Sequence, residues 1–446
     1  MISSVNWAAK VVIISQLGHI NFLFGQKLAL FRRFSLLLPL KMTRHTFIIS
    51  VLLLITASFF SCGRFGRKEV VVINTDSIFF DLGKIQVAQR TRMANKVFNS
   101  MFRNGLNGVV LYAEQGQVIY EKANGWRDLS KRHKDSLRID DAFQLSSDSK
   151  MFTAEAVMLL KAEGKLDYDD DVKKYIPELP YEGITIRHLL NHRSGLPRYD
   201  AMADKHWPDR RKPFSNEAMI KMMAEKTPEL YNAPDIVFFY NNVNYALLGS
   251  VVERVSRQPF EDFMRERIFE PLGMTHSFIY SMRGDTAVSI YMPVEVHGHD
   301  MYKRGPVKAQ NDYLNGVMGD KIMFSTVEDL YKFNLALDNH LLLPDSLQAE
   351  AFKPGSPKWK NNENYGFGWR MSKEHPDAYF HFGWWKGYRS LVIRDAKHRR
   401  FLAILTNTTQ LIPVDETFGF VEDTTVMLPP SEPWPKNKEN GPKQFH

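Results

Sequence analysis

Cysteine is almost absent from this chain, which has a single cysteine, Cys62, among 446 residues. One cysteine excludes an intramolecular disulfide, a cysteine-based zinc site and an iron–sulfur cluster. Hydrophobic residues make up 44% and charged residues 24%, close to the average of soluble globular proteins. This composition excludes a mostly disordered, a collagen-like and a polytopic membrane protein. The length suits two or three domains, or one large domain with an insertion.

Acidic residues are missing from the first 61 positions, which nevertheless hold six basic residues. The formal net charge is +8, from 58 basic and 50 acidic residues, so 52 basic residues face 50 acidic ones from Cys62 onward. A nearly neutral body lacks the basic surface that neutralises nucleic-acid phosphates. We therefore expect no nucleic-acid partner.

A short apolar run, residues 47–60, lies after Arg44 and His45 and just before Ser61 and Cys62. Its 14 residues are too few to span a bilayer comfortably but are typical of a signal-peptide core. The segment resembles a bacterial lipoprotein signal, in which Cys62 is acylated and becomes the mature N-terminus. This predicts a lipid anchor in the bacterial cell envelope, facing the periplasm. The alternative is an ordinary secretory signal or anchor with an incidental cysteine, which would give a secreted protein if Cys62 is not lipidated.

We expect Met42 to be the natural start, with residues 1–41 as upstream sequence, and these residues are left out of the fold prediction. The hydrophobic pattern predicts strands first, helices in the middle and strands last, with late strands at 365–371, 378–382, 388–394 and 400–406. This order indicates an α+β fold, in which an antiparallel sheet flanked by helices is completed by both chain ends and carries an inserted, mostly helical domain. The predicted divisions are an upstream segment with signal peptide (1–61), a tether (62–84), the first part of the α/β domain (85–164), the helical domain (165–345), the second part of the α/β domain (346–428) and a disordered tail (429–446).

Several common active-site patterns are absent, among them G-x-S-x-G, the phosphate-binding G-x-x-x-x-G-K-[ST], G-x-G-x-x-G and H-E-x-x-H. We expect His297-Gly298-His299-Asp300 to be a polar surface loop rather than a metal site, and we predict no metal or cofactor.

The chain contains one S-x-x-K, Ser147-Asp148-Ser149-Lys150, at the start of a predicted helix. Ser147 and Lys150 are three residues apart and share one helical face. The helix N-terminus favours negative charge there, and a serine becomes a nucleophile when a neighbouring base takes its proton. Taken alone, this four-residue pattern favours a serine that caps a helix and a solvated lysine one turn further on.

Longer blocks in the same order around this motif carry a family resemblance. They are EGKLDYDDDVKKYIPELP, ITIRHLLNHRSGLP, FYNNVNYALLGSVVERVSRQPFEDFMRERIFEPLGMTHS, STVEDLYKF and YGFGWR. Together they resemble the serine β-lactamase-like family, which includes class C β-lactamases, penicillin-binding carboxypeptidases, D-aminopeptidases and esterases. The resemblance runs from about residue 92 to residue 407, and it implies Ser147 as the acylated nucleophile and Lys150 as its partner.

The second motif of that family, Y-x-N, has two matches, Tyr240-Asn241-Asn242 and Tyr313-Leu314-Asn315. Tyr240 and Asn242 lie inside the matching block, and we choose them. The resemblance implies that Tyr240 exchanges a proton with Ser147 and the leaving group, while Asn242 orients the substrate.

The third motif departs from the lactamase form K-T-G, because the strand position holds His381-Phe382-Gly383-Trp384. Gly383 would let the substrate approach the backbone, and the Trp384 N–H would form an oxyanion hole with that of Ser147.

A mostly neutral His381 would anchor a substrate carboxylate poorly, so we expect weak or no β-lactam hydrolysis, unless Lys386 or Arg389 supplies the charge. We also expect acylation to change as His381 titrates between about pH 5.5 and 7.5.

The sequence thus predicts an envelope-anchored serine hydrolase that acts on a small amide, peptide or ester, with D-amino-acid peptides as one candidate. The alternatives are a β-lactamase and a non-catalytic protein that binds peptidoglycan or peptides on the same scaffold. A further open choice concerns the long C-terminal helix of the family, which is either reduced here or replaced by another element.

Overall fold

The computed structural model describes residues 11–15, 69–73, 75–131 and 135–429. The chain divides into two compact units, Met1–Lys84 and Ile85–His446. In the first unit, β1 (Val11–Ser15) pairs antiparallel with β2 (Glu69–Ile73). The predicted signal peptide, Cys62 and nearly all of the predicted tail (430–446) lie outside the described residues.

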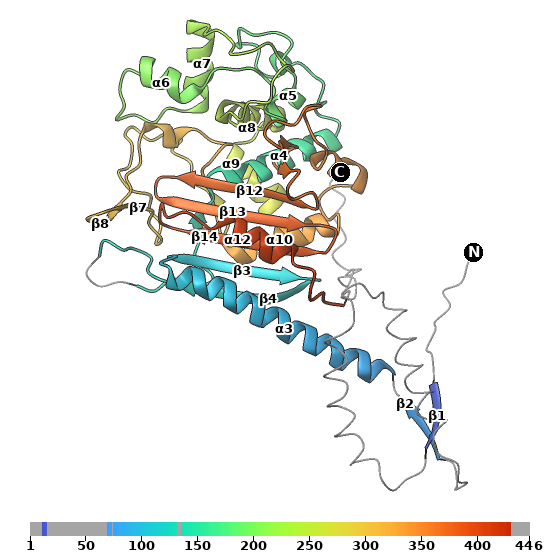
Figure 1. Cartoon of the computed structure of the whole chain (residues 1–446). Helices are drawn as coiled ribbons and strands as arrows, with labels where there is room; N and C mark the ends of the chain where they lie inside the picture. The colour runs from blue at the N-terminus through green and yellow to red at the C-terminus, as the bar shows by residue number, and fades with distance from the viewer. Residues whose placement is uncertain (1–10, 16–68, 74, 132–134, 430–446) are drawn as a thin grey trace. The chain divides into compact units, whose positions relative to one another are not determined.

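A seven-stranded antiparallel sheet forms the centre of the second unit (Figure 1). Its strands, in spatial order, are β10 (Glu363–Tyr365), β11 (Arg370–Ser372), β12 (Ala378–Trp385), β13 (Tyr388–Asp395), β14 (Arg400–Thr406), β3 (Gly108–Glu114) and β4 (Gln117–Asn124). The last strand of the chain, β14, pairs with β3 from the beginning of the unit. Both ends of the unit therefore complete one sheet, which confirms the predicted α+β fold.

The sheet is buried on both faces, as the alternation of β3 shows. Val109 and Leu111 belong to one apolar cluster, whereas Val110 and Tyr112 belong to a second cluster on the other face. Successive side chains of a strand point to opposite faces. All seven residues of β3 are buried, so the run of apolar residues reflects cover on both sides.

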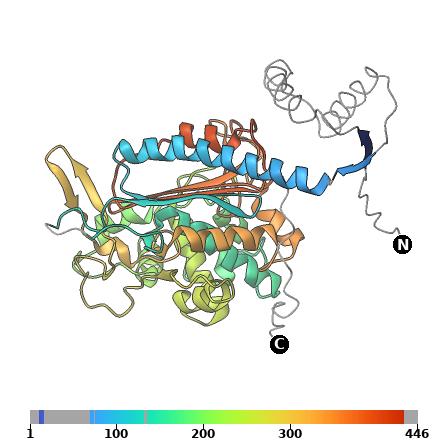
Figure 2. The same cartoon turned by 90° about the horizontal axis from the view of Figure 1, so that it is seen from below.

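One face is covered by the part of α3 (Thr75–Arg103) that belongs to this unit, from Ile85 onward, and by α12 (Val414–Glu422), both of which lie over the sheet in Figure 2. The Phe420 ring of α12 lies 5.1 Å from Phe98 of α3 and 4.7 Å from Tyr112 of β3, centroid to centroid. Buried Arg90 joins the same elements through Glu114 Oε2 at 2.9 Å and Phe420 O at 2.9 Å. The C-terminal helix is therefore reduced to nine residues, and α3 provides much of the remaining cover.

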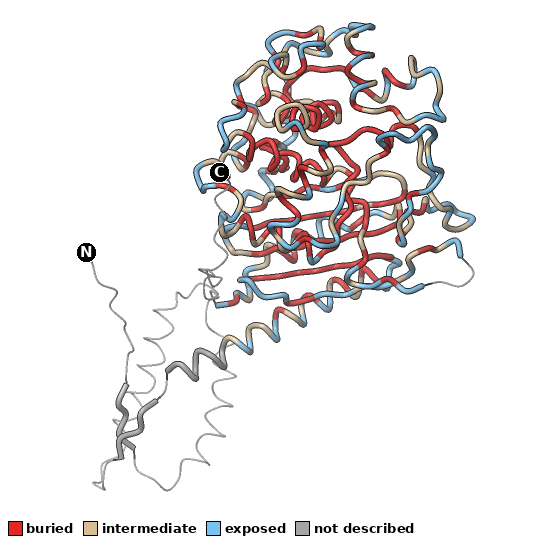
Figure 3. The backbone as a smooth tube through the Cα atoms, turned by 180° about the vertical axis from the view of Figure 1, so that it is seen from behind, coloured by how far each residue is buried: buried red, intermediate tan, exposed pale blue. Residues whose placement is uncertain are grey.

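The other face carries the nucleophile helix and most of the segment between residues 165 and 345, where Figure 3 shows buried stretches mixed with intermediate and exposed ones. The α-helices here are α4 (Ser149–Ala162), α5 (Ile186–Leu190), α6 (Tyr199–His206), α7 (Asn216–Lys226), α8 (Asn242–Ser256), α9 (Phe260–Met264), α10 (Val327–Asp338) and α11 (Asp345–Ala351). Short strands accompany them: β5 (Phe143–Gln144), β9 (Met323–Ser325) and β6 (Phe278–Ile279) form one sheet, and β7 (His299–Tyr302) pairs with β8 (Gly305–Lys308).

The predicted strand at 365–371 is wrong, because this segment is mostly the turn between β10 and β11. The Gly366 N–H donates to Trp369 O at 2.8 Å, and Gly368 has a φ of +82°. A Cβ at Gly368 would lie 2.9 Å from Lys150 O. The two glycines thus let the turn fold tightly and pack against the helix of the S-x-x-K motif.

The predicted surface loop at 297–300 is also wrong for His299, which is fully buried in β7. Its Nε2 lies 3.0 Å from Asp128 Oδ1, so the side chain has a structural partner. In the described part of the chain, no group of three or more His, Cys, Asp or Glu side chains could hold a metal ion. Among the same residues, no helix has the length and apolar character needed to cross a membrane.

Glu155 of α4 should make the stability of the protein depend on pH. The side chain is 4% exposed, its Oε1 has no hydrogen-bond partner, and burial raises its pKa to about 8. A pKa raised in the folded state stabilises the protein at low pH, and this stability is lost as the pH rises through 8. We expect urea unfolding to show a loss of about 3 kcal/mol from this group between pH 5 and 8.

Glu155→Gln should remove that part of the pH dependence, while the same substitution at exposed Glu229 should leave it unchanged. Equal pH slopes for the wild type and Glu155→Gln would contradict the assignment.

Candidate active site

Ser147 lies in a sharp turn between β5 and α4. The preceding residue, Ser146, is buried and has a φ of +53°, a left-handed conformation that is unfavourable for a residue with a side chain. Ser147 follows in a 3₁₀ turn (Ser146–Asp148) that leads directly into α4. Strained backbone of this kind persists only where the surrounding packing holds it. The turn leaves Ser147 half-buried at the N-terminal end of the helix.

Lys150 is completely buried and directs its ammonium group at Ser147. Its Nζ lies 3.2 Å from Ser147 Oγ and donates to Asp320 O at 2.8 Å. The same nitrogen lies 5.2 Å from the ring centroid of Tyr240 and 5.9 Å from that of Tyr245. The structure thus brings Ser147, Lys150 and Tyr240 together, although about ninety residues separate Lys150 from Tyr240.

Tyr240 and Asn242 lie at the N-terminus of α8, where the Asn241 side chain caps the helix by accepting from the Val243 N–H. Tyr240 Oη and Asn242 Oδ1 are buried and have no hydrogen-bond partner. Buried polar atoms are nearly always paired, so two unpaired ones beside the nucleophile indicate places for substrate atoms. The alternative motif has other partners: Tyr313 donates to Asp204 Oδ1, and the Asn315 side chain accepts from the N–H of Asp312, which caps a short turn.

His192 is a residue of the site that the sequence prediction did not single out. Its ring lies 4.4 Å from that of Tyr240, and its Nδ1 accepts from the Asn241 N–H at 3.2 Å. Burial and the charge of Lys150 hold its pKa well below the usual value, so it stays a neutral acceptor. The block ITIRHLLNHRSGLP contains it, but only the fold shows that it supports the start of α8.

His381 lies 6.2 Å from Tyr240, ring centroid to ring centroid, and both of its ring nitrogens have partners within the protein. It is fully buried, with Nδ1 at 3.2 Å from Asp148 Oδ1 and Nε2 at 2.9 Å from Tyr365 Oη. Burial, together with the charges of Arg370 and Lys150, holds its pKa well below 6.5. The lowered pKa argues against the predicted titration of His381 between about pH 5.5 and 7.5, because that range was centred on the ordinary value of 6.5.

Gly383 lies against the nucleophile turn instead of leaving room for the substrate. A Cβ there would lie 2.2 Å from Leu145 O and 2.9 Å from Ser146 Cβ. Trp384 follows with a side chain that is 63% exposed. The pairing of β12 with β11 ends at Phe380, so the following residues of β12, including Trp384, have no partner in β11. The role of the Trp384 N–H in an oxyanion hole stays a prediction.

Comparison with known proteins gives the same assignment as this geometry. A family model described as Beta-lactamase matches residues 93–417. Penicillin-binding protein 4* of Bacillus subtilis is 33% identical over 313 residues, which are 68% of this chain and 69% of that protein. The chain belongs to the beta-lactamase family.

Solved structures share the fold of this family member. The octameric penicillin-binding protein homologue from Pyrococcus abyssi has a TM-score of 0.61 at 24% identity and covers 74% of this chain and 75% of its own. The D-amino acid amidase from Ochrobactrum anthropi has a TM-score of 0.62 at 22% identity and covers 75% of this chain and 100% of its own. The predicted enzyme class, a serine hydrolase of the beta-lactamase type, is confirmed by this membership.

The positive charge absent from the third motif of this family member is supplied by Arg370 of β11. Its guanidinium carbon lies 4.4 Å from the ring centroid of Tyr240 and 4.3 Å from that of Phe382. Its Nε is buried and has no hydrogen-bond partner, and its ion pair with exposed Glu363 is long, at 3.8 Å. The block YGFGWR contains Arg370, but only the turn at Gly366–Trp369 shows that it lies beside Tyr240.

The two cations proposed from the sequence have other partners. Lys386 forms an ion pair with Asp312 at 2.5 Å. Arg389 donates to Thr409 O at 2.8 Å and lies over the exposed ring of Trp384. Neither has a recorded contact with Ser147, Lys150 or Tyr240, so Arg370 is the better candidate for a substrate-binding cation.

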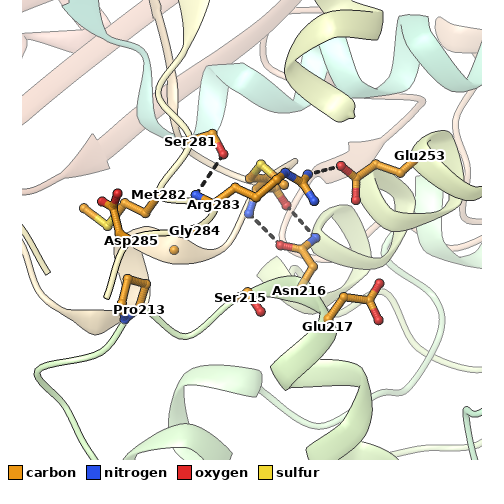
Figure 4. A pocket seen from close by; sticks show the side chains of 12 residues that line it. Pro213, Ser215, Asn216, Glu217, Glu253, Ser281, Met282, Arg283, Gly284 and Asp285 are labelled. Carbon is orange, nitrogen blue, oxygen red and sulfur yellow. Dashed lines mark hydrogen bonds and ion pairs between the residues drawn. The ribbon is translucent and has the colours of Figure 1, made fainter. Parts of the chain in front are cut away.

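A separate pocket of about 320 Å³ is lined by Asn216, Arg283 and Met318 among other residues (Figure 4). Asn216 lines it and bonds to both backbone groups of Met318, donating to O at 3.2 Å and accepting from N at 2.8 Å. Two residues further on, Asp320 O accepts from Lys150. Ser147 and Lys150 do not line this pocket, which is therefore distinct from the candidate active site.

Proposed function

We propose that this protein is an envelope-anchored serine hydrolase that forms an acyl-enzyme on Ser147 with small amide, peptide or ester substrates. The observation that carries the proposal is the buried Lys150 ammonium, with Nζ at 3.2 Å from Ser147 Oγ and beside the ring of Tyr240. A protein that only binds peptides has no need for a buried cation aimed at a serine, and this argues against the non-catalytic alternative.

The geometry supports a two-step reaction. In the first step, Ser147 Oγ forms a bond to the substrate carbonyl carbon while its proton moves to the deprotonated Tyr240 oxygen, which the neighbouring Lys150 ammonium stabilises, and that proton passes to the leaving nitrogen or oxygen as its bond to carbon breaks. In the second step, a water molecule loses a proton to the same pair and attacks the acyl carbon. The bond to Ser147 then breaks, and the serine regains its proton.

Two further groups are in place for the substrate. Asn242 Oδ1 is unpaired and accepts an amide N–H from the substrate. The N–H groups of Ser147 and Trp384 would stabilise the oxyanion, aided by the N-terminal end of α4.

Arg370 supports substrates that carry an anionic group next to the reacting carbonyl. Its side chain is 12% exposed, and one nitrogen is unpaired, so an added carboxylate would gain a charge-assisted hydrogen bond. The names of two similar proteins, a penicillin-binding protein and a D-amino acid amidase, favour peptides with D-amino acids. We therefore propose D-amino-acid peptides with a free carboxylate as the substrate class.

The β-lactamase alternative gains support from the same arginine. The expectation of weak β-lactam hydrolysis depended on a site without a cation beside Tyr240, and Arg370 fills that place. Turnover of a chromogenic cephalosporin distinguishes a β-lactamase from a peptidase or esterase.

Intact-protein mass after treatment with a fluorophosphonate tests the nucleophile. Ser147 Oγ displaces fluoride from phosphorus, so we expect one adduct on the wild type and none on Ser147→Ala. Lys150→Ala should slow labelling by about 10² or more, because it removes the group that activates the serine. The absence of an adduct on folded wild type would favour the non-catalytic binding protein.

A pair of peptides that differ in a C-terminal carboxylate or carboxamide tests the role of Arg370. We expect the wild type to prefer the acid, and Arg370→Gln to reduce that preference by about tenfold, the effect of losing one charged hydrogen bond. Arg389→Gln is the matched control, since Arg389 lies over Trp384 instead of Tyr240. An unchanged preference in Arg370→Gln would contradict the proposed substrate class.

Mass analysis of the mature protein from a bacterial host tests the anchor. We expect the chain to begin at Cys62 with added acyl chains and to fractionate with membranes, because acylation with more than one chain gives stable anchoring. Cys62→Ser should lose the added mass. A mature wild-type chain without acyl groups would leave an ordinary secretory signal as the correct interpretation.

A further inference from the structure

Asp148 lies between Ser147 and Lys150 in the sequence, and a role in helix capping does not explain why its side chain is buried. It occupies the N-cap position of α4, where an aspartate usually accepts from a backbone N–H of the first turn. Here its side chain makes no capping hydrogen bond. The residue is 0% exposed, and Oδ2 has no hydrogen-bond partner. A buried carboxyl group is costly unless it has a specific partner.

That partner is His381, which is 233 residues away in the sequence. The His381 Nδ1 lies 3.2 Å from Asp148 Oδ1 and 3.1 Å from Phe382 O. Because both neighbours are oxygens, Nδ1 carries the proton and donates. Nε2 is then an acceptor, and Tyr365 Oη donates to it at 2.9 Å. A polar chain therefore connects the residue after the nucleophile with β12 and β10.

Charged and titratable groups from several strands and helices surround Asp148 and His381, and His192 lowers the pKa of His381 together with the cations named next. Those around Asp148 are Lys150 on α4, Arg370 on β11, His381 on β12 and, through His381, Tyr365 on β10; Ser390 on β13 adds a hydroxyl. Burial raises the pKa of Asp148 to about 7, while Ser390 and the two cations act against this rise. Burial and the same cations hold the pKa of His381 well below 6.5. The carboxyl group of this pair is therefore the member that changes charge near neutral pH.

We propose that Asp148 and His381 are a positioning pair that fixes the turn carrying Ser147 against strand β12, and that the ionised carboxylate is the more effective form. The proposal rests on the proposed function, since it concerns the same nucleophile. Neither side chain has a recorded contact with Ser147 Oγ, so both act through the backbone between them. This turn is the element that packs on Gly383, where a Cβ would meet Leu145 O and Ser146 Cβ.

The sign of the pH effect follows from the hydrogen bond. An ionised Asp148 accepts from His381 Nδ1–H in a charge-assisted bond, which is roughly twice as strong as a neutral one. The turn is therefore held more firmly as the pH rises from 6 to 8. The substitution Asp148→Asn keeps the shape of the side chain but removes its ability to become charged, so the variant should lack this part of the rise.

The test measures the rate of fluorophosphonate labelling of the full chain from pH 6 to pH 8 in the wild type, Asp148→Asn and Glu155→Gln. We expect Asp148→Asn to react about tenfold more slowly than the wild type at pH 8 and to differ less at pH 6. Glu155 is a buried carboxyl of the same helix without a recorded contact to Ser147, Lys150 or His381, and its variant should follow the wild-type profile.

A second variant, His381→Gln, keeps a polar atom near Tyr365 but removes the Nδ1–H donor. The double variant should react no more slowly than either single variant, because both changes remove the same bond. Thermal unfolding serves as the check on folding, and we expect Asp148→Asn to be at least as stable as the wild type at pH 8, since it buries no charge. A purely structural role predicts lower stability with an unchanged pH profile.

The outcomes separate the two proposals. A wild type that is labelled at Ser147, with Asp148→Asn labelled equally fast at every pH, would overturn the positioning pair and leave the serine hydrolase in place. Additive losses in the double variant would also overturn the pair. A folded wild type that takes no label would overturn the proposed function, and the pair with it.

Discussion

The buried ammonium group of Lys150 is the interaction on which the rest of the site depends. Removing a cation from water costs several kcal/mol unless close partners replace the lost hydration. Here those partners are Ser147 Oγ, the backbone oxygen of Asp320 and the faces of Tyr240 and Tyr245. These partners come from three parts of the chain. Ser147 is therefore activated only in the folded protein, where all three parts surround Lys150 Nζ.

The central sheet supplies the rigid surface on which the turn that carries Ser147 packs. Pairing of β14 with β3 joins the two ends of the second unit, and the covered faces hold β12 in position. The Ser146–Ser147 turn packs on Gly383 of β12, and this contact supports the left-handed Ser146. Strain at the nucleophile is therefore balanced by packing from a strand that lies more than 230 residues further along the chain.

The charges of the site are arranged differently from those that the third motif suggested. A positive charge is present beside Tyr240, but it comes from Arg370 and reaches the site through the glycine turn between β10 and β11. The histidine in the motif is instead a neutral, buried partner of Asp148. The site thus separates two tasks, with Arg370 placed beside Tyr240 and His381 bonded to the side chain of Asp148, the residue that follows the nucleophile.

Local sequence was sufficient for features that depend on neighbouring residues. The three-residue spacing placed Ser147 and Lys150 on one side of a helical turn, the hydrophobic period predicted α4, and the order of strands and helices predicted a sheet completed from both ends. The Y-x-N block placed Tyr240 before α8. The tertiary structure alone decided that Arg370 lies over Tyr240, that Asp148 meets His381 and that His299 is buried. These contacts join residues separated by more than a hundred positions, and their energies arise from burial and charge in a shared interior, which no single segment of the sequence contains.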